Sequence, residues 1–408
     1  MKRGVLATFI ILIMLLSCSP KAPVTPPPTQ QATPPATTQT SASTTTAQPP
    51  PSPPTPPRPP TAPTISPTKL LPPMDAFMKG FAFADWNSYR REQPWPLYYP
   101  PYAESTLKNL AATGPNWINL VVTIFQENIA STNVTRDPLV TASDSALRHM
   151  VDFAHSLGMR VSLMPMIILP NDPSHFAGHI GTAFTSEAQW QEWFTSYRET
   201  INHYAAFAHN SEVDMFVIGH ELGATTHRDS DWRRIIQEVR QQFKGPITYS
   251  SLASTASFPH GEEKRITWWD AVDYIGIQGY YKLTTKNDPT VEELKEAWVK
   301  NGHIALLEEL SRRFNKPIIF TELGYVSKDG ANKVPAYFKL EAPLDLQEQA
   351  DCYQAAFEVL WGKPWLKGIF WWQWLANPVK WPGGPNDKGE SPYGKPAEEV
   401  VKKFYLSQ

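Results

Sequence analysis

Short apolar runs alternate with amphipathic stretches from Gly80 onward, and this alternation constrains the fold more than any other feature of the chain. Most of the runs are rich in Val, Ile, Phe and other β-forming residues. Eight runs are strand candidates: 80–84, 117–124, 160–168, 215–219, 246–251, 274–279, 317–321 and 368–372. Eight alternations of strand and helix predict a parallel sheet. They fit a closed (β/α)8 TIM barrel, with a doubly wound open sheet as the alternative.

Six of the seven segments between these runs carry a clear helix candidate. Among these are 143–157, 186–209, 230–243, 290–314 and 347–360, and a shorter, weaker helix covers 262–272. A final predicted helix, 397–406, closes the chain. Ser186 with Gln189, and Thr290 with Glu293, have the spacing of capping boxes, in which each side chain bonds the backbone of the other residue. Cys352 falls within the 347–360 helix, where we expect a buried and inert thiol.

The N-terminus reads as a targeting signal. A basic start at residues 1–3 is followed by a mostly apolar stretch over 4–16, which is short for a membrane span and suits a signal sequence. The stretch ends Leu-Leu-Ser-Cys18, which resembles a bacterial lipobox. We therefore expect residues 1–17 to be a signal peptide and Cys18 to carry a lipid anchor that holds the protein to the bacterial membrane at the cell surface. An ordinary signal peptide or a retained membrane anchor is the alternative.

A sharp change of composition separates this signal from the rest of the chain. Residues 19–73 hold 20 of the 41 prolines, many Thr and Ser, and no acidic residue. Such a segment cannot bury enough apolar surface to fold, and its prolines favour extended polyproline II structure. We predict a disordered tether over 18–73 that is followed by one folded domain over 74–408.

Charge and motifs exclude several classes of function. The net charge is −2 and no basic run occurs, so we expect no nucleic-acid partner, and we expect a monomer. His175 and His179 have a zinc-like spacing, but Pro173 and Gly178 argue against a helix there and no third ligand is near. No phosphate-binding glycine loop or serine nucleophile elbow is present. The sequence thus predicts neither a metal nor a cofactor.

Two glutamates follow predicted strands directly. Glu221 comes after the fourth run and Glu322 after the seventh. In a barrel the chemistry lies at the carboxyl ends of the strands, and a carboxylate there is unfavourable without a task or a partner. Strands four and seven would place the two acids on opposite sides of one cavity. A structural ion pair is the alternative for either glutamate, and a satisfied core histidine is the alternative for His220.

Aromatic residues gather at the same strand ends. The first run ends at Asp85 and Trp86, the sixth at Tyr280, and the eighth contains Trp371, Trp372 and Trp374. Strand alternation predicts that Trp372 and Trp374 share one face and that Trp371 points to the other. Each Trp could pack on the outside of the barrel instead. Two acids ringed by aromatics are what glycosidic cleavage requires, because one acid protonates the leaving oxygen and the other attacks or activates water.

With these residues the chain resembles clan A of the retaining glycoside hydrolases, and most closely glycoside hydrolase family 113. The resemblance spans residues 76–408. The matching stretches are 79–81, 218–222, 273–281, 320–325 and 391–398.

The resemblance implies a β-1,4-mannanase that cuts the polymer internally with retention of configuration. Glu221 would be the general acid/base and Glu322 the nucleophile, with a hydrogen bond from Tyr280 to Glu322. Trp372 would form the floor under the sugar. His220 stands where the clan usually has an Asn that binds the sugar 2-hydroxyl, and histidine can also donate to a hydroxyl. Substrate contacts are further expected from Trp374, Trp86 and Asp85.

The expected substrate is a β-1,4-linked polysaccharide, with β-mannan first. Another clan A specificity, for β-glucan or β-galactan, is the alternative among enzymes. A surface lipoprotein that binds glycans without cleaving them is the alternative outside enzymes. Retention predicts that the two carboxyl groups stand about 5–5.5 Å apart. It also requires a raised pKa for Glu221 and a depressed pKa for Glu322.

Overall fold

The computed structural model describes residues 70–86, 96–138, 140–253 and 261–407. The signal peptide, Cys18 and nearly all of the proposed tether lie outside these residues, so those assignments stay predictions. Within the described part of the chain, no helix is both long and apolar enough to cross a membrane.

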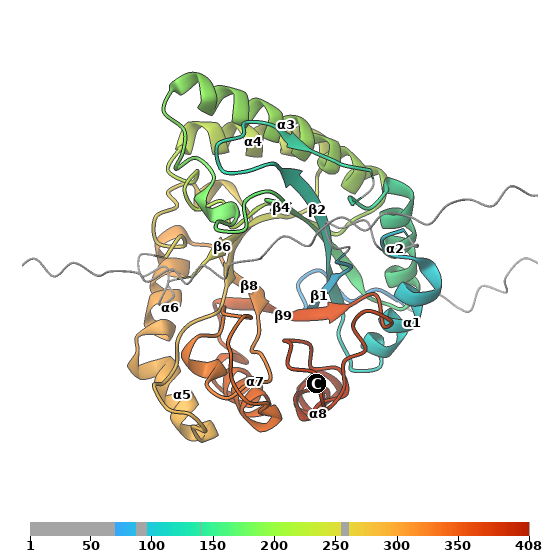
Figure 1. The fold of residues 1–408 in the computed structure, drawn as a ribbon, viewed down its shortest axis with the longest axis vertical. Helices are drawn as coiled ribbons and strands as arrows, with labels where there is room; N and C mark the ends of the chain where they lie inside the picture. Colours follow the sequence, from blue (N-terminus) through green and yellow to red (C-terminus); the bar gives the residue numbers. More distant parts are fainter. Residues whose placement is uncertain (1–69, 87–95, 139, 254–260, 408) are drawn as a thin grey trace, which may run out of the picture. The chain divides into compact units, whose positions relative to one another are not determined.

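Eight parallel strands close into a barrel, as predicted (Figure 1). Each strand pairs with the next along the chain, and the last pairs with the first: Phe81 lies opposite both Ile118 and Trp371. The strands are β1 (Met78–Ala84), β2 (Trp117–Gln126), β4 (Arg160–Ile168), β5 (Met215–His220), β6 (Ile247–Leu252), β7 (Tyr274–Gln278), β8 (Ile318–Leu323) and β9 (Leu366–Leu375).

Helices surround the barrel and cover the outer face of its strands (Figure 1). The predicted helix starts hold, because the Ser186 and Thr290 side chains each accept a hydrogen bond from the third helical N–H and complete their capping boxes. The helices are α1 (Pro100–Ala111), α2 (Asp144–Ser156), α3 (Glu187–Asn210), α4 (Asp229–Gln242), α5 (Val291–Lys300), α6 (His303–Phe314), α7 (Leu346–Leu360) and α8 (Pro396–Leu406).

The structure corrects three local predictions. The helix expected over 290–314 is two helices, because the chain turns at Gly302, whose φ of +80° is left-handed. The weak helix expected over 262–272 is only a 3-10 turn, Trp269–Ala271. An antiparallel strand that was not expected, β3 (Val134–Thr135), pairs with the end of β2.

Tertiary packing explains the missing helix. Trp268 and Trp269 are fully buried, and their indole N–H groups donate to loop carbonyls of Thr226 and Glu263 at 3.1 and 3.0 Å. These bonds hold an irregular chain that local propensity alone does not specify.

The barrel interior is filled in layers, which leaves room only at one end. A cluster near the strand starts closes the bottom: Met78, Trp117, Met215, Ile319 and Phe370. A second cluster lies nearer the strand ends: Ala82, Ala84, Val121, Met164, Met166 and Val217. Both are buried and apolar, so the barrel is packed rather than open, and space inside it is left only at the carboxyl ends of the strands.

Candidate active site

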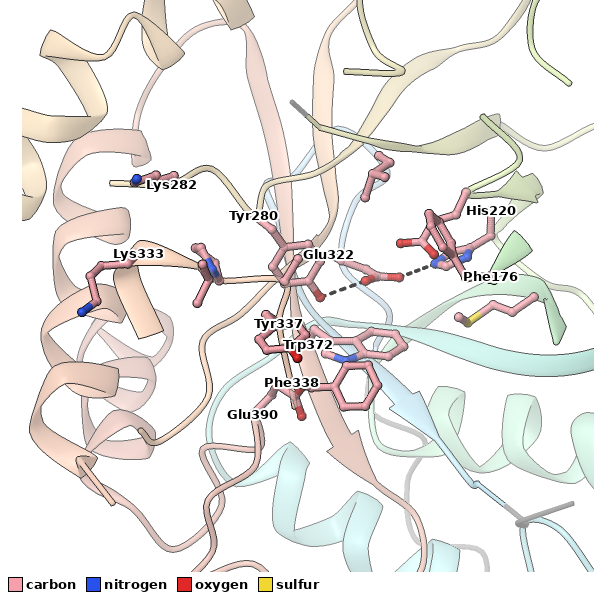
Figure 2. A pocket seen from close by; sticks show the side chains of 16 residues that line it. Phe176, His220, Tyr280, Lys282, Glu322, Lys333, Tyr337, Phe338, Trp372 and Glu390 are labelled. Carbon is pink, nitrogen blue, oxygen red and sulfur yellow. Dashed lines mark hydrogen bonds and ion pairs between the residues drawn. The ribbon is translucent and has the colours of Figure 1, made fainter. Parts of the chain in front are cut away.

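A cavity of ≈ 600 Å³ opens at the carboxyl ends of the strands. Its wall contains both glutamates singled out by the sequence. Figure 2 shows Glu322 together with aromatic and basic side chains from the loops that follow the strands. The lining residues are Met166, Phe176, His220, Glu221, Leu252, Tyr280, Lys282, Glu322, Lys333, Val334, Pro335, Ala336, Tyr337, Phe338, Trp372 and Glu390.

Glu322 lies within β8 and is clamped on both carboxylate oxygens. Its Oε1 is 2.5 Å from His220 Nε2, and its Oε2 accepts a hydrogen bond from the Tyr280 hydroxyl at 2.9 Å (Figure 2). Glu322 is 3 % exposed, so these two partners replace the water that a buried carboxylate would otherwise need. The hydrogen bond predicted from Tyr280 to Glu322 is therefore present.

Glu221 enters the cavity from a strained turn. It follows β5 directly, and its φ of +52° is left-handed, which is uncommon for a residue with a side chain. Its backbone N–H donates to Ser250 O of the neighbouring β6 at 3.0 Å. The reversal of the chain at this point turns the Glu221 carboxyl toward the cavity that also contains Glu322.

Electrostatics distinguish Glu221 from an ordinary carboxyl. Burial raises the pKa of Glu221 to about 7, with a further upward contribution from the Glu322 charge, while His220 and the Gln278 side chain lower it. Burial lowers the pKa of His220, but the charges of Glu322 and Glu221 outweigh it, so this pKa lies above its ordinary value. At neutral pH Glu221 can thus hold a proton beside an acid held by two donors.

Trp372 forms an aromatic wall of the cavity. It belongs to β9 and lies beside Trp86, with ring centroids 5.8 Å apart. The Trp86 indole N–H donates to Gln373 Oε1 at 2.7 Å, so Trp86 supports Trp372 rather than lining the cavity itself. A side chain at Gly324 would meet the Trp372 carbonyl oxygen at 2.5 Å, so only glycine permits this close approach of the chain after Glu322.

The prediction for Trp374 is wrong. Trp374 is 2 % exposed in the core outside the barrel, where its indole N–H donates to Thr106 O at 3.0 Å and its ring packs on Tyr393. The cause is an irregular register: Phe81 pairs with Trp371, but Phe83 pairs with Trp374, so β9 contains one extra residue. That residue breaks strand alternation, and Trp371 and Trp374 point outward while Trp372 faces the cavity.

Asp85 also does not line the cavity. It is 7 % exposed and accepts a hydrogen bond from Tyr98 N at 2.7 Å, and burial raises its pKa above the ordinary value. Its observed contact is thus with the backbone after β1 rather than with the space a sugar would occupy.

Sequence reasoning missed the loop residues on one side of the cavity. The loop between β8 and α7 supplies Lys333, Tyr337 and Phe338, and the loop between β9 and α8 supplies Glu390 (Figure 2). Tyr337 and Phe338 are 53 % and 60 % exposed, as is common for aromatic side chains in a ligand-binding groove. These loops have no periodic pattern, so the only signal in the sequence was their length between two strong elements.

Among the described residues, no group of three or more His, Cys, Asp or Glu side chains could hold a metal ion. His175, which had been considered as a ligand, is paired with Asp172 at 2.7 Å. The polar side chains that line the cavity carry carboxyl, imidazole, phenol and ammonium groups. Such groups suit acid–base and nucleophilic chemistry on a neutral polar molecule.

Two acids line the cavity at the mouth of a closed (β/α)8 barrel: Glu221 can hold a proton, and Glu322 is held by two hydrogen-bond donors. Together with the aromatic wall they define a glycoside hydrolase of the TIM-barrel class. The model of Glycoside Hydrolase Family 113 matches residues 86–395, and the chain belongs to that family. The resemblance to this family and the assignment as a clan A glycoside hydrolase are thereby confirmed.

Solved structures agree with the family assignment. A structure described as a GH113 β-1,4-mannanase is 28 % identical, with a TM-score of 0.69, and covers 82 % of this chain and 100 % of its own. A GH113 β-mannanase from Alicyclobacillus acidocaldarius is 27 % identical with a TM-score of 0.68, over 81 % of this chain and 98 % of its own. A β-glucuronidase from Ruminococcus gnavus, 15 % identical with a TM-score of 0.52, covers 81 % of this chain and 50 % of its own and shares the fold. No curated protein matches the sequence.

Proposed function

We propose that this glycoside hydrolase cleaves β-1,4-mannan with retention of configuration, using Glu322 as nucleophile and Glu221 as general acid/base. The observation that carries the proposal is the pairing of a doubly hydrogen-bonded Glu322 with a Glu221 of raised pKa in one cavity. Family membership and the names of the 27–28 % identical structures favour mannan as the substrate.

The first step of the proposed mechanism forms a glycosyl-enzyme. The anionic Glu322 attacks the anomeric carbon while Glu221 gives its proton to the departing sugar oxygen. Bonds from His220 and Tyr280 orient the Glu322 carboxylate for this attack. Formation of the ester removes the Glu322 charge that raises the pKa of Glu221.

In the second step Glu221 acts as a base. Because the Glu322 charge is gone, the pKa of Glu221 falls and Glu221 is left as an anion. This anion takes a proton from a water molecule as the water oxygen attacks the glycosyl-enzyme, from the face that the leaving sugar vacated. Trp372 would hold the sugar ring beside the two acids by packing against its C–H groups. The expected carboxyl separation of about 5–5.5 Å remains a prediction.

Two substitutions test the assignment. Glu322→Ala should reduce the hydrolysis of soluble mannan by several orders of magnitude, because the two acids act as a unit. Glu221→Ala should also be slow on mannan, because the departing sugar is no longer protonated. With 2,4-dinitrophenyl β-mannobioside, whose leaving group needs no proton, the glycosyl-enzyme still forms, and azide should speed its breakdown and yield a β-glycosyl azide, since azide needs no base to attack the intermediate. Glu238→Ala, which breaks a surface ion pair with Arg198 on α3, is the matched control and should keep full activity.

Retained turnover in Glu322→Ala would refute the nucleophile assignment. Chromatography of products from β-mannan, β-glucan and β-galactan would decide the substrate, and a protein that binds but cleaves none of them would be a glycan-binding protein instead.

We further propose that the enzyme is a monomer held at the bacterial cell surface by a lipid on Cys18. The support is the lipobox-like sequence before Cys18 and the proline-rich segment after it. Cys18→Ser should abolish the incorporation of labelled fatty acid and move the protein from the membrane to the soluble fraction. Unchanged fractionation of that variant would contradict the proposal.

A further inference from the structure

A buried glutamate, Glu262, lies beside Glu221 but outside the large cavity. A cavity of ≈ 20 Å³, enough for a single water molecule, separates the two acids. Its lining consists of Gly178, Glu221, Gly223, Leu252, Glu262 and Arg265. Glu262 is 2 % exposed and does not line the large cavity, so it has no direct access to a substrate there.

Glu262 ends a chain of hydrogen bonds that begins at the residue after Glu221. The backbone N–H of Leu222 donates to the Tyr249 hydroxyl at 2.7 Å, and that hydroxyl in turn donates to Glu262 Oε1. The other carboxyl oxygen, Oε2, accepts from Leu252 N at 2.7 Å. A Cβ on Gly223 would lie only 3.8 Å from the same oxygen, so the chain after Glu221 packs directly on Glu262.

These bonds meet the backbone where it is strained. The φ of +52° at Glu221 is unfavourable for a residue with a side chain, and such a conformation persists only where its surroundings fix it. Glu221 N is held by Ser250 O on one side, and Leu222 N is held by Tyr249 on the other. Together the two bonds fix the peptide groups on both sides of the Glu221 Cα.

We propose that Tyr249 and Glu262 are positioning residues for Glu221: they hold the left-handed turn that aims its carboxyl at the glycosidic oxygen. This inference rests on the proposed function of Glu221 as general acid/base. This positioning role gives a reason for the buried carboxyl of Glu262, which is not part of a surface ion pair with any described residue. A loss of the turn would displace the proton donor while leaving Glu322 and its partners His220 and Tyr280 in place.

The electrostatic surroundings agree with this role. Burial raises the pKa of Glu262 to about 8, opposed by the bonds from Tyr249 and Leu252 and by Arg265, and the Glu221 charge raises it further. The groups that act on Glu221 are His220, Glu322 and Gln278. Below about pH 8 Glu262 is therefore mostly neutral, so it places no second fixed negative charge beside the acid/base.

The test uses a property that general destabilisation does not affect. A 2,4-dinitrophenyl leaving group departs without protonation, so its release does not require a well-placed acid, whereas release of a sugar does. Tyr249→Phe should lower kcat/KM for mannan by about 10- to 100-fold, but change kcat/KM for 2,4-dinitrophenyl β-mannobioside by less than about 3-fold. Glu262→Gln should give the same selective loss, because one amide oxygen cannot accept from both Tyr249 and Leu252.

Tyr197→Phe is the matched control. Tyr197 is also a buried tyrosine bonded to β5, with its hydroxyl donating to Ile218 O at 2.8 Å, but it has no bond to Glu262 or to the turn. Tyr197→Phe should lower the free energy of unfolding by a similar amount, and should change kcat/KM equally for mannan and for 2,4-dinitrophenyl β-mannobioside. Equal losses on both substrates in Tyr249→Phe and Glu262→Gln, or no loss on either, would overturn the inference.

A separate result would refute the proposed function itself. If Glu221→Ala hydrolyses mannan normally, or if azide does not accelerate its turnover of 2,4-dinitrophenyl β-mannobioside, Glu221 is not the acid/base and the premise is lost. If Glu221→Ala behaves as an acid/base variant while Tyr249→Phe and Glu262→Gln lack leaving-group selectivity, only the positioning role is refuted.

Discussion

Removal of the His220 side chain should both slow the enzyme and shift its pH profile upward. In His220→Ala, Glu322 would keep the bond from Tyr280 and lose the 2.5 Å partner at Oε1. A hydrogen bond to a buried charge contributes about 1.5–3 kcal/mol, which corresponds to a loss of about 10- to 150-fold in kcat/KM. The loss should fall on kcat/KM whatever the leaving group, because the nucleophile acts in every glycosylation step.

The direction of the pH shift follows from the charges around Glu221. Activity requires a protonated Glu221, so it declines as the pH rises through that pKa, which lies at about 7. The His220 charge lowers the pKa of Glu221, so its removal should raise it. The basic limb of the profile should therefore move to higher pH.

The measurement is kcat/KM for mannan between pH 4 and 10, in wild type and in His220→Ala. His155→Gln is the control, because His155 also pairs with a carboxylate, that of Asp214, at 2.8 Å. Asp214 lies just before the start of β5, whereas His220 ends that strand. Its pH profile should match wild type. A basic limb in His220→Ala that stays in place or moves down would refute the coupling between His220 and Glu221.

Three further outcomes follow from the packing and the charges. Trp372→Ala should raise KM for mannan by about 10-fold, because the aromatic wall of the cavity is lost. Trp374→Ala should lower the free energy of unfolding by about 3–5 kcal/mol with little change in KM, as expected of a core tryptophan. Burial raises the pKa values of Glu221 and Glu262 from 4.5 to about 7 and about 8, so the native state binds more protons than the unfolded state above pH 4.5. Denaturant unfolding should therefore show stability falling from about pH 5 to 8, by at most about 1.4 kcal/mol per pH unit and group, and Glu262→Gln should flatten that slope.

Local patterns were sufficient to predict the strands. All eight barrel strands lie within a few residues of the predicted runs, because a strand buried on both faces must be almost continuously apolar. The paired helices that replaced 290–314 show the limit of periodicity: Gly302 changes the direction of the chain without interrupting the apolar pattern.

The two acids could also be recognised from sequence. An ionisable residue directly after a buried apolar run is conspicuous, and strand ends meet at one face of a barrel, so Glu221 and Glu322 had to be near each other. The position of Trp374 could not be predicted, because the extra residue in β9 is visible only in its register with β1. Glu262 was likewise hidden, since it lies in a segment without a strand or helix and is brought to Glu221 by Tyr249 of β6.

The sequence by itself determined the order of strands and helices, the barrel, and the strand ends that carry the chemistry, since these depend on hydrophobic patterning and chain direction. Tertiary structure alone decided which side chains face the cavity at those ends, how Glu322 is held, and what fixes the turn at Glu221. Those features depend on register, on left-handed backbone and on hydrogen bonds between residues far apart in the chain, none of which leaves a local signal.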